Sequence, residues 1–225
     1  MSYDEEDAAR DAFYDRIREE LTPEIIDEFT SERLTSFYNT HPDVAEKPFK
    51  ALVEARALIQ ESHETAAFLY AVIATEVNIK SVLVYPIVNG FIHNEMIAPL
   101  ITNMVLSQTR GQFDKVKEVF LNILKEAAHF DLQTYSRVGA NKNLWDEITE
   151  IQKRRNRILH AAEIVTILDA EMAIAIAAEV VEVVFPRVAQ NLGFHIHEGF
   201  KLCAKHDCSP EWLAMRKRLG ISPGN

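Results

Sequence analysis

Apolar residues recur at helical spacing along most of the chain, and short polar or proline-containing breaks separate the periodic stretches. The first two stretches cover residues 4–21 and 22–38, and the second opens with a Thr-Pro pair that is typical of a helix start. A polar break at 39–43 follows them. We therefore expect residues 1–45 to form a helical N-terminal extension.

The longest periodic stretch, residues 46–85, contains no glycine and only one early proline, which predicts one long helix. Its second half is apolar on most faces, so we expect this half to lie deep in the core. Shorter helices are predicted over residues 94–109 and 113–136, because an Arg-Gly pair separates them and a glycine-containing turn follows.

A helix with a basic second half is predicted from Leu144 to about residue 164. Thr166 and Asp169 fit a capping box, which predicts the start of a long apolar helix that ends before a glycine. The fold class that follows is all-α. We expect an antiparallel helical bundle over residues 46–193, and a tail over 194–225 that carries one short helix.

Composition supports helices, since only 7 glycines and 8 prolines are present in 225 residues and a sheet-rich fold needs many turns. The formal net charge of −10 argues against a protein that binds nucleic acid over its whole surface, because phosphate contacts normally require a basic protein. If the chain acts on RNA, it must do so through a small basic patch.

The chain shows no signal-like N-terminus and no apolar run that is long enough to cross a bilayer, and it contains only two cysteines. Few cysteines without an export signal indicate a reducing compartment. We expect a cytoplasmic protein with no membrane partner.

The predicted basic helix concentrates positive charge in one place. Four cations fall within five residues: Lys153, Arg154, Arg155 and Arg157, interrupted by Asn156. At 100° per residue, Asn156 and His160 lie about 40° apart on the helix, whereas Arg155 lies about 140° from His160. A site that uses both requires either the reach of the arginine side chain or a second copy of the helix.

These residue types suit cleavage of RNA without a metal. Histidine can take a proton from the ribose 2′-OH and return one to the leaving oxygen, because its unperturbed pKa is about 6.5. Arginine binds two phosphate oxygens at once, and asparagine orients either group. The same cations and histidine also suit the end of a helix on dipole grounds alone, so the pattern leaves a purely structural role open.

The string RRNRILHAAE, followed by TILDAEMAIAIAAEVVEVV, resembles the signature of the HEPN superfamily, and HETAAFLYAVIATEVNIKSVL is similar to its long core helix. The resemblance covers roughly residues 47–193 and identifies no subfamily. It implies a HEPN-like bundle that dimerises with the two motifs face to face.

The resemblance also implies residue roles. It makes Arg155, Asn156 and His160 catalytic, makes Lys153, Arg154 and Arg157 phosphate contacts, and lets Glu76 either orient a motif residue or pair with Lys80. The expected function is a metal-independent, cofactor-free endoribonuclease that leaves 2′,3′-cyclic phosphate ends. Its expected role is in a toxin–antitoxin, stress or phage-defence system. RNA, a second copy and an antitoxin or other protein are the expected partners. A non-catalytic HEPN-like interaction and dimerisation module remains the alternative.

Histidines and cysteines gather in the tail, where zinc is a second possibility. The five residues His195, His197, Cys203, His206 and Cys208 fall within 14 positions. Thiolates and imidazoles are preferred zinc ligands, but this spacing matches no closed zinc motif. The expectation is therefore packed cysteines and exposed histidines without a metal, with zinc as the alternative.

Overall fold

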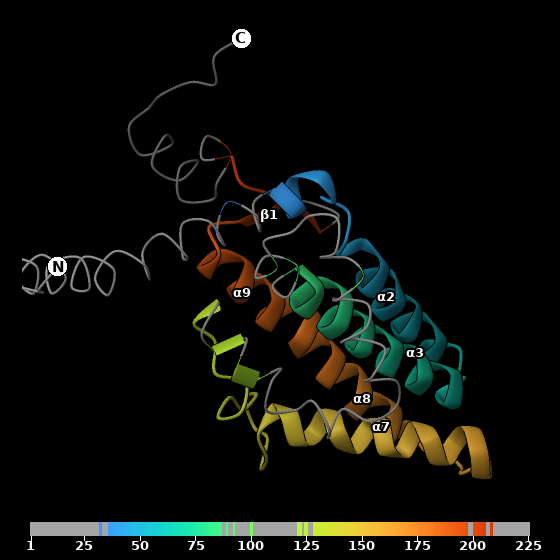
Figure 1. Cartoon of the computed structure of the whole chain (residues 1–225). Helices are drawn as coiled ribbons and strands as arrows, with labels where there is room; N and C mark the ends of the chain where they lie inside the picture. Colours follow the sequence, from blue (N-terminus) through green and yellow to red (C-terminus); the bar gives the residue numbers. More distant parts are fainter. Residues whose placement is uncertain are drawn as a thin grey trace, which may run out of the picture.

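The computed structural model describes residues 32, 36–86, 89, 92, 100, 121–122, 124–125, 128–197, 200–205 and 208. Helices make up 70% of these described residues and strands 4%, which confirms the all-α prediction. Figure 1 shows the helices of the bundle running side by side, with one further helix across their end.

The predicted helix over residues 46–85 is wrong, because the chain reverses direction within it. Helix α2 (Glu46–Gln60) and helix α3 (Glu64–Val77) form an antiparallel pair that packs along its length. Ser62 has a φ of 60° at the turn, in the left-handed region that usually favours glycine. Without a glycine or proline, the only local sign of the break was the polar run from Glu61 to Thr65.

Both central helices widen into π-helical turns at the same level of the bundle. Helix α3 continues as η1 (Asn78–Val84). Helix α8 (Ile167–Ala178) continues as η3 (Glu179–Val184) and then as α9 (Phe185–Asn191), and η3 contacts η1. The predicted start and end of this second stretch are confirmed by a capping box at its first residues and a glycine just after α9.

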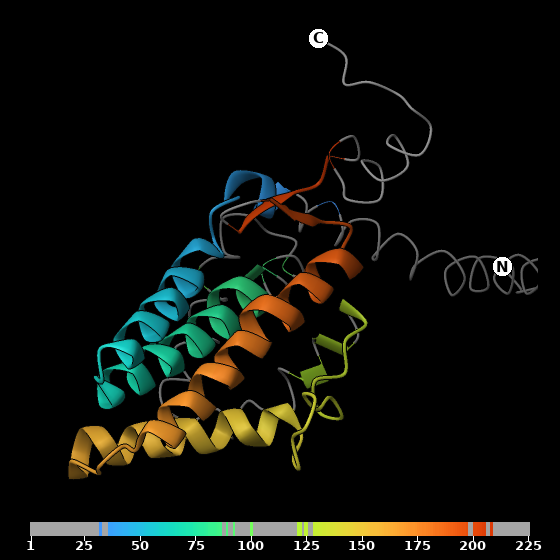
Figure 2. The same cartoon turned by 180° about the vertical axis from the view of Figure 1, so that it is seen from behind.

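Helix α7 (Leu144–Ala161) begins and ends with defined caps. The Asn143 side chain accepts a hydrogen bond from the Asp146 amide, and Ala162 leaves the helix with a φ of 50°. The helix therefore stops about three residues earlier than predicted. Figures 1 and 2 show α7 lying across one end of the bundle, where it contacts α3 and α8.

The helix predicted over 113–136 is wrong in its last part. Described residues between 121 and 128 are helical, but the chain leaves the helix at His129, which has a φ of 48°. The Asp131 carboxylate then accepts hydrogen bonds from the amides of Gln133 and Thr134, so a local turn replaces the helical ladder. The helix predicted over 94–109 lies outside the described residues, apart from Leu100.

The core reaches beyond both predicted boundaries of the bundle. Tyr38 is 2% exposed, donates a hydrogen bond to the Val82 carbonyl at 2.8 Å and meets Phe194 edge to face. Burial raises the pKa of Tyr38. Leu202 is also buried. Residues on either side of the predicted 46–193 bundle therefore share its hydrophobic core.

The tail contains a β-hairpin that the sequence did not predict. Strand β1 (His195–His197) pairs antiparallel with strand β2 (Lys201–Cys203). Three residues per strand are too few for a readable alternation of apolar and polar positions. The helix predicted after Pro210 lies outside the described residues.

The expectation that no apolar stretch is long enough to cross a bilayer is wrong, because the described helical stretch Glu64–Val84 is long and apolar enough by length and composition. Its most apolar window is 61% buried inside the fold, against α2, α7 and α8. This burial is typical of the core helix of a soluble protein.

Candidate active site

The predicted motif residues all lie on α7, but they point to different sides of it. Ile151 and Ile158 are buried and hold the helix against the bundle. Arg155 lies close to this buried face, while Asn156 and His160 lie farther round the helix. One copy of α7 therefore presents its arginine and its histidine in different directions.

Arg155 is held by a carboxylate from another helix. Its Nη2 donates a hydrogen bond to Oε1 of Glu76 on α3 at 2.6 Å, and the two side chains are 27% and 17% exposed. Glu76 was expected either to orient a motif residue or to pair with Lys80, and in the structure its carboxylate binds Arg155. The half-buried ion pair fixes the guanidinium at the junction of α3 and α7.

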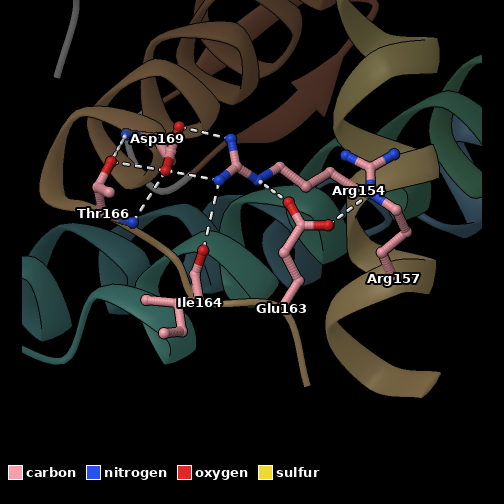
Figure 3. A network of polar contacts seen from close by, with 6 residues as sticks. All are labelled: Arg154, Arg157, Glu163, Ile164, Thr166 and Asp169. Carbon is pink, nitrogen blue, oxygen red and sulfur yellow. Dashed lines mark hydrogen bonds and ion pairs between the residues drawn. The ribbon is translucent and has the colours of Figure 1, made fainter. Parts of the chain in front are cut away.

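Arg154 belongs to a network that joins the end of α7 to the start of α8 (Figure 3). Its Nη1 and Nη2 donate to the two carboxylate oxygens of Asp169 at 2.5 and 2.7 Å, and its Nε lies 3.2 Å from Glu163. Asp169 also completes the capping box with Thr166. The bidentate contact therefore ties the helix cap of α8 to α7.

Glu163 stands between two of the predicted phosphate contacts. It accepts a hydrogen bond from Arg157 Nε at 2.5 Å on one oxygen and pairs with Arg154 through the other. The bond from Arg157 lowers the pKa of the Glu163 carboxyl. Burial favours the neutral form of Asp169, but hydrogen bonds from Thr166 and Arg154 outweigh burial and lower its pKa. Phosphate binding by either arginine must compete with these carboxylates.

Sequence reasoning missed the carboxylates at 163 and 169 as partners of the motif arginines. Asp169 was assigned only to a helix cap, and Glu163 had no assignment. The available signal was the acid that follows the basic run closely in RRNRILHAAE. The sequence places this acid close to the arginines along the chain. It does not show on which face of α7 the segment after the helix packs.

Four residues of α7 form a polar stripe at spacings of three and four: Lys153, Asn156, Arg157 and His160. Lys153, Arg157 and His160 are exposed and Asn156 is partly buried. Among the described residues, no hydrogen bond or ion pair engages the side chains of Lys153, Asn156 or His160. The stripe therefore offers an ammonium, an amide and an imidazole to solvent.

A pocket of about 560 Å³ opens beside this stripe, between α7, α8 and the turn before α7. Its cationic side chains are those of Arg137, Lys142, Lys153, Arg154 and Arg157, and its carboxylates are those of Glu147, Glu150 and Asp169. Arg137 and Glu147 form a largely buried ion pair at 2.8 Å. Cations outnumber carboxylates here, although the chain as a whole carries a net charge of −10.

Of the five metal candidates in the tail, four converge. The ligand atoms of His195, His197, Cys203 and Cys208 all lie within 4.8 Å of one another. His206 lies outside the described residues. This cluster is at the hairpin, away from α7, so it is a separate site (Figures 1 and 2).

Comparison of the chain with known protein families, with curated proteins and with solved structures gives no match.

Proposed function

We propose that the chain is a metal-independent endoribonuclease of the HEPN type that acts in the cytoplasm, in a toxin–antitoxin, stress or phage-defence role. The observation that carries the proposal is the cation-rich pocket beside the exposed His160 stripe of an otherwise acidic chain. Phosphate is attracted where cations gather, so an acidic protein that cuts RNA needs one local basic surface. In this pocket the Lys153 ammonium has no carboxylate partner among the described residues, and it is the cation directly available to a phosphate.

Two copies of the chain are part of the proposal. Arg155 and His160 lie about 140° apart on α7. Their side chains therefore do not readily reach the same phosphate within one copy of the chain. Exposed apolar side chains lie about one helical turn from the Arg155–Glu76 pair on both helices: Ile73 on α3 is 47% exposed and Leu159 on α7 is 56% exposed. A second copy that covers these side chains brings two motif helices together.

The chemistry then follows from the residue types. One His160 imidazole takes the proton of the ribose 2′-OH, and the 2′ oxygen attacks the adjacent phosphorus. The bond from phosphorus to the 5′ oxygen breaks, and the second His160, as imidazolium, protonates that oxygen. Arg155 stabilises the charge on the phosphate. The products are a 2′,3′-cyclic phosphate and a 5′-OH end.

The test is cleavage of RNA by the purified chain in the presence of EDTA. We expect wild-type cleavage to persist and His160→Ala to lose roughly 100-fold or more in rate, the range for general acid–base catalysis. His63→Ala is the matched control, because His63 is also an exposed histidine beside a helix end (60% exposed). Equal cleavage by His160→Ala, or products with a 3′-OH end, would overturn the proposal.

A second function, a non-catalytic HEPN-like interaction module, is favoured by the carboxylates that already neutralise Arg154 and Arg157. In that case α7 contacts a protein and the network only shapes the surface. Expression of the chain in cells separates the two functions. A ribonuclease slows growth and His160→Ala relieves the effect, whereas an interaction module leaves growth unchanged in both cases.

A further inference from the structure

The β-hairpin of the tail sorts its side chains into two faces. Ile196 and Leu202, which are paired across the strands, pack against or into the core. The alternate positions His195, His197 and Cys203 therefore lie on the opposite face, and His195 is the cross-strand partner of Cys203. This register places two imidazoles and one thiol on the same face of the hairpin.

Cys208, five residues beyond Cys203, reaches the same point. Its Sγ lies 3.2 Å from Nε2 of His195, 3.4 Å from Nε2 of His197 and 3.5 Å from Sγ of Cys203. The two sulfurs are too far apart for a disulfide, in which they stand about 2.05 Å apart. Neither cysteine forms a disulfide.

The three separations from Cys208 are close to edges of a tetrahedron around a zinc ion, and all four ligand atoms lie within 4.8 Å of one another. With zinc–sulfur and zinc–nitrogen bonds of about 2.3 and 2.05 Å, two sulfurs stand about 3.8 Å apart and a sulfur and a nitrogen about 3.6 Å apart. The three separations from Cys208 fall within about 0.4 Å of these values. Two imidazoles and two thiolates are also a ligand set that selects zinc over hard cations.

We propose that His195, His197, Cys203 and Cys208 bind one Zn²⁺ ion as a structural site. Four protein ligands complete the coordination of zinc and leave no position for a substrate, which separates structural from catalytic zinc sites. The Lys205 amide donates to Cys203 Sγ at 3.4 Å, a contact that stabilises the thiolate form of a ligand sulfur.

A zinc ion at this site stabilises the hairpin. An isolated hairpin of two short strands is marginally stable at best. This one is joined to the bundle by the hydrogen bond from the Leu202 amide to the Pro42 carbonyl at 3.0 Å and by Phe200 stacked on Phe49 at 4.1 Å. Zinc at the outer face connects Cys208 to both strands, and so extends the anchored structure to the chain beyond β2.

The zinc proposal is independent of the ribonuclease proposal, because the hairpin and α7 lie at opposite ends of the bundle (Figures 1 and 2). It changes how EDTA experiments are interpreted. A loss of cleavage in EDTA counts against the metal-free mechanism only if the chelated protein keeps its helical circular dichroism. Cleavage by the Cys208→Ser variant, assayed without EDTA, also shows whether loss of the zinc ligand alone affects the rate.

The test is the zinc content of the full chain, purified under reducing conditions without a metal-affinity step. We expect one zinc per chain in the wild type, loss of that zinc in Cys203→Ser and Cys208→Ser, and full retention in the His63→Ala control. Because loss of a ligand can also unfold the hairpin, Co²⁺ replacement in the wild type provides a second readout. Tetrahedral Co²⁺ with thiolate charge-transfer bands is the expected spectrum.

Three results would overturn the zinc site: a reduced wild-type chain that binds neither Zn²⁺ nor Co²⁺, an octahedral Co²⁺ spectrum without thiolate bands, or folded serine variants that still hold one zinc.

Discussion

At the α7 end of the molecule, guanidinium groups meet carboxylates of the same chain, whereas at the hairpin end imidazole and thiol groups meet one another. Arg154, Arg155 and Arg157 each have a carboxylate partner. The ligand atoms of His195, His197, Cys203 and Cys208 lie within 4.8 Å of one another. Charge pairing within the chain stabilises a fold without a ligand. A cluster of metal ligands, by contrast, gains most from a shared cation.

The same comparison separates two kinds of polar residue within α7 itself. The Nη1 and Nη2 donors of Arg154 bind the Asp169 carboxylate and the Ile164 carbonyl without a substrate, and its Nε lies 3.2 Å from the Glu163 carboxylate without a hydrogen bond. Among the described residues, the side chains of Lys153, Asn156 and His160 have no such partners. The first group is therefore expected to affect stability, and the second to affect activity together with Arg155, the proposed phosphate ligand. Four predictions test the residues of the α7 end that already have partners, in order of decreasing effect.

The largest effect is expected for Arg155→Ala. Removing the cation that holds the phosphate should reduce RNA cleavage by about 100-fold or more, the cost of losing one transition-state donor. Arg56→Ala is the matched control, because Arg56 also forms an interhelical ion pair, with Glu182 at 2.7 Å. Single-turnover cleavage rates measure the effect. Equal losses in the two variants would mean that Arg155 only stabilises the fold.

Arg154→Ala should destabilise the protein by about 2 kcal/mol, because it leaves the half-buried Asp169 carboxylate without its charged donors. The free energy of unfolding from urea titration measures the change. Zinc content should stay at one per chain, since the hairpin lies at the other end of the bundle. A variant that loses zinc together with stability would show that the two ends are not independent.

Thr166→Ala should cost about 1 kcal/mol of stability, the usual cost of losing a helix N-cap. The Thr166 hydroxyl accepts from the Asp169 amide, and its own amide donates to the Asp169 carboxylate. Thr166→Ser keeps the hydroxyl and serves as the control. A serine variant as unstable as the alanine variant would place the effect in packing instead of the cap.

Acid should weaken the α7 end by the smallest amount. The folded-state pKa values of Asp169 and Glu163 are lowered, so their contribution to stability is fully present above the unfolded values near 4. It is lost as the pH falls below that range and through the folded values. Urea midpoints between about pH 5 and pH 3 should fall more steeply for the wild type than for Arg154→Ala. Parallel curves would contradict the assignment.

Helical periodicity and caps predicted much of the architecture. The all-α class, the Thr166 cap, the end of the last long helix before Gly193 and the turn before Leu144 are all confirmed. The reversal at Ser62 was missed because a serine, not a glycine, takes the left-handed conformation there. The hairpin was missed because three-residue strands carry too little periodicity to recognise.

The candidate sites show a similar limit. Spacing along α7 correctly placed Asn156 and His160 on one face, since that geometry depends only on the helix. Spacing could not predict the ion pairs of Arg154 with Asp169 and of Arg155 with Glu76, because the partners are 15 and 79 residues apart in the sequence. In the tail, the spacing of histidines and cysteines matched no known zinc motif, and only the pairing of β1 with β2 brought the ligands together.

By itself, the sequence determined the all-α class, where several helices begin and end, and which residue types could do chemistry, because these depend on local periodicity and hydrogen bonding. Only the tertiary structure decided which cations are neutralised within the chain and which histidines and cysteines meet. Those outcomes depend on how distant segments pack, and packing is governed by the burial of the whole apolar core. No local pattern contains that information.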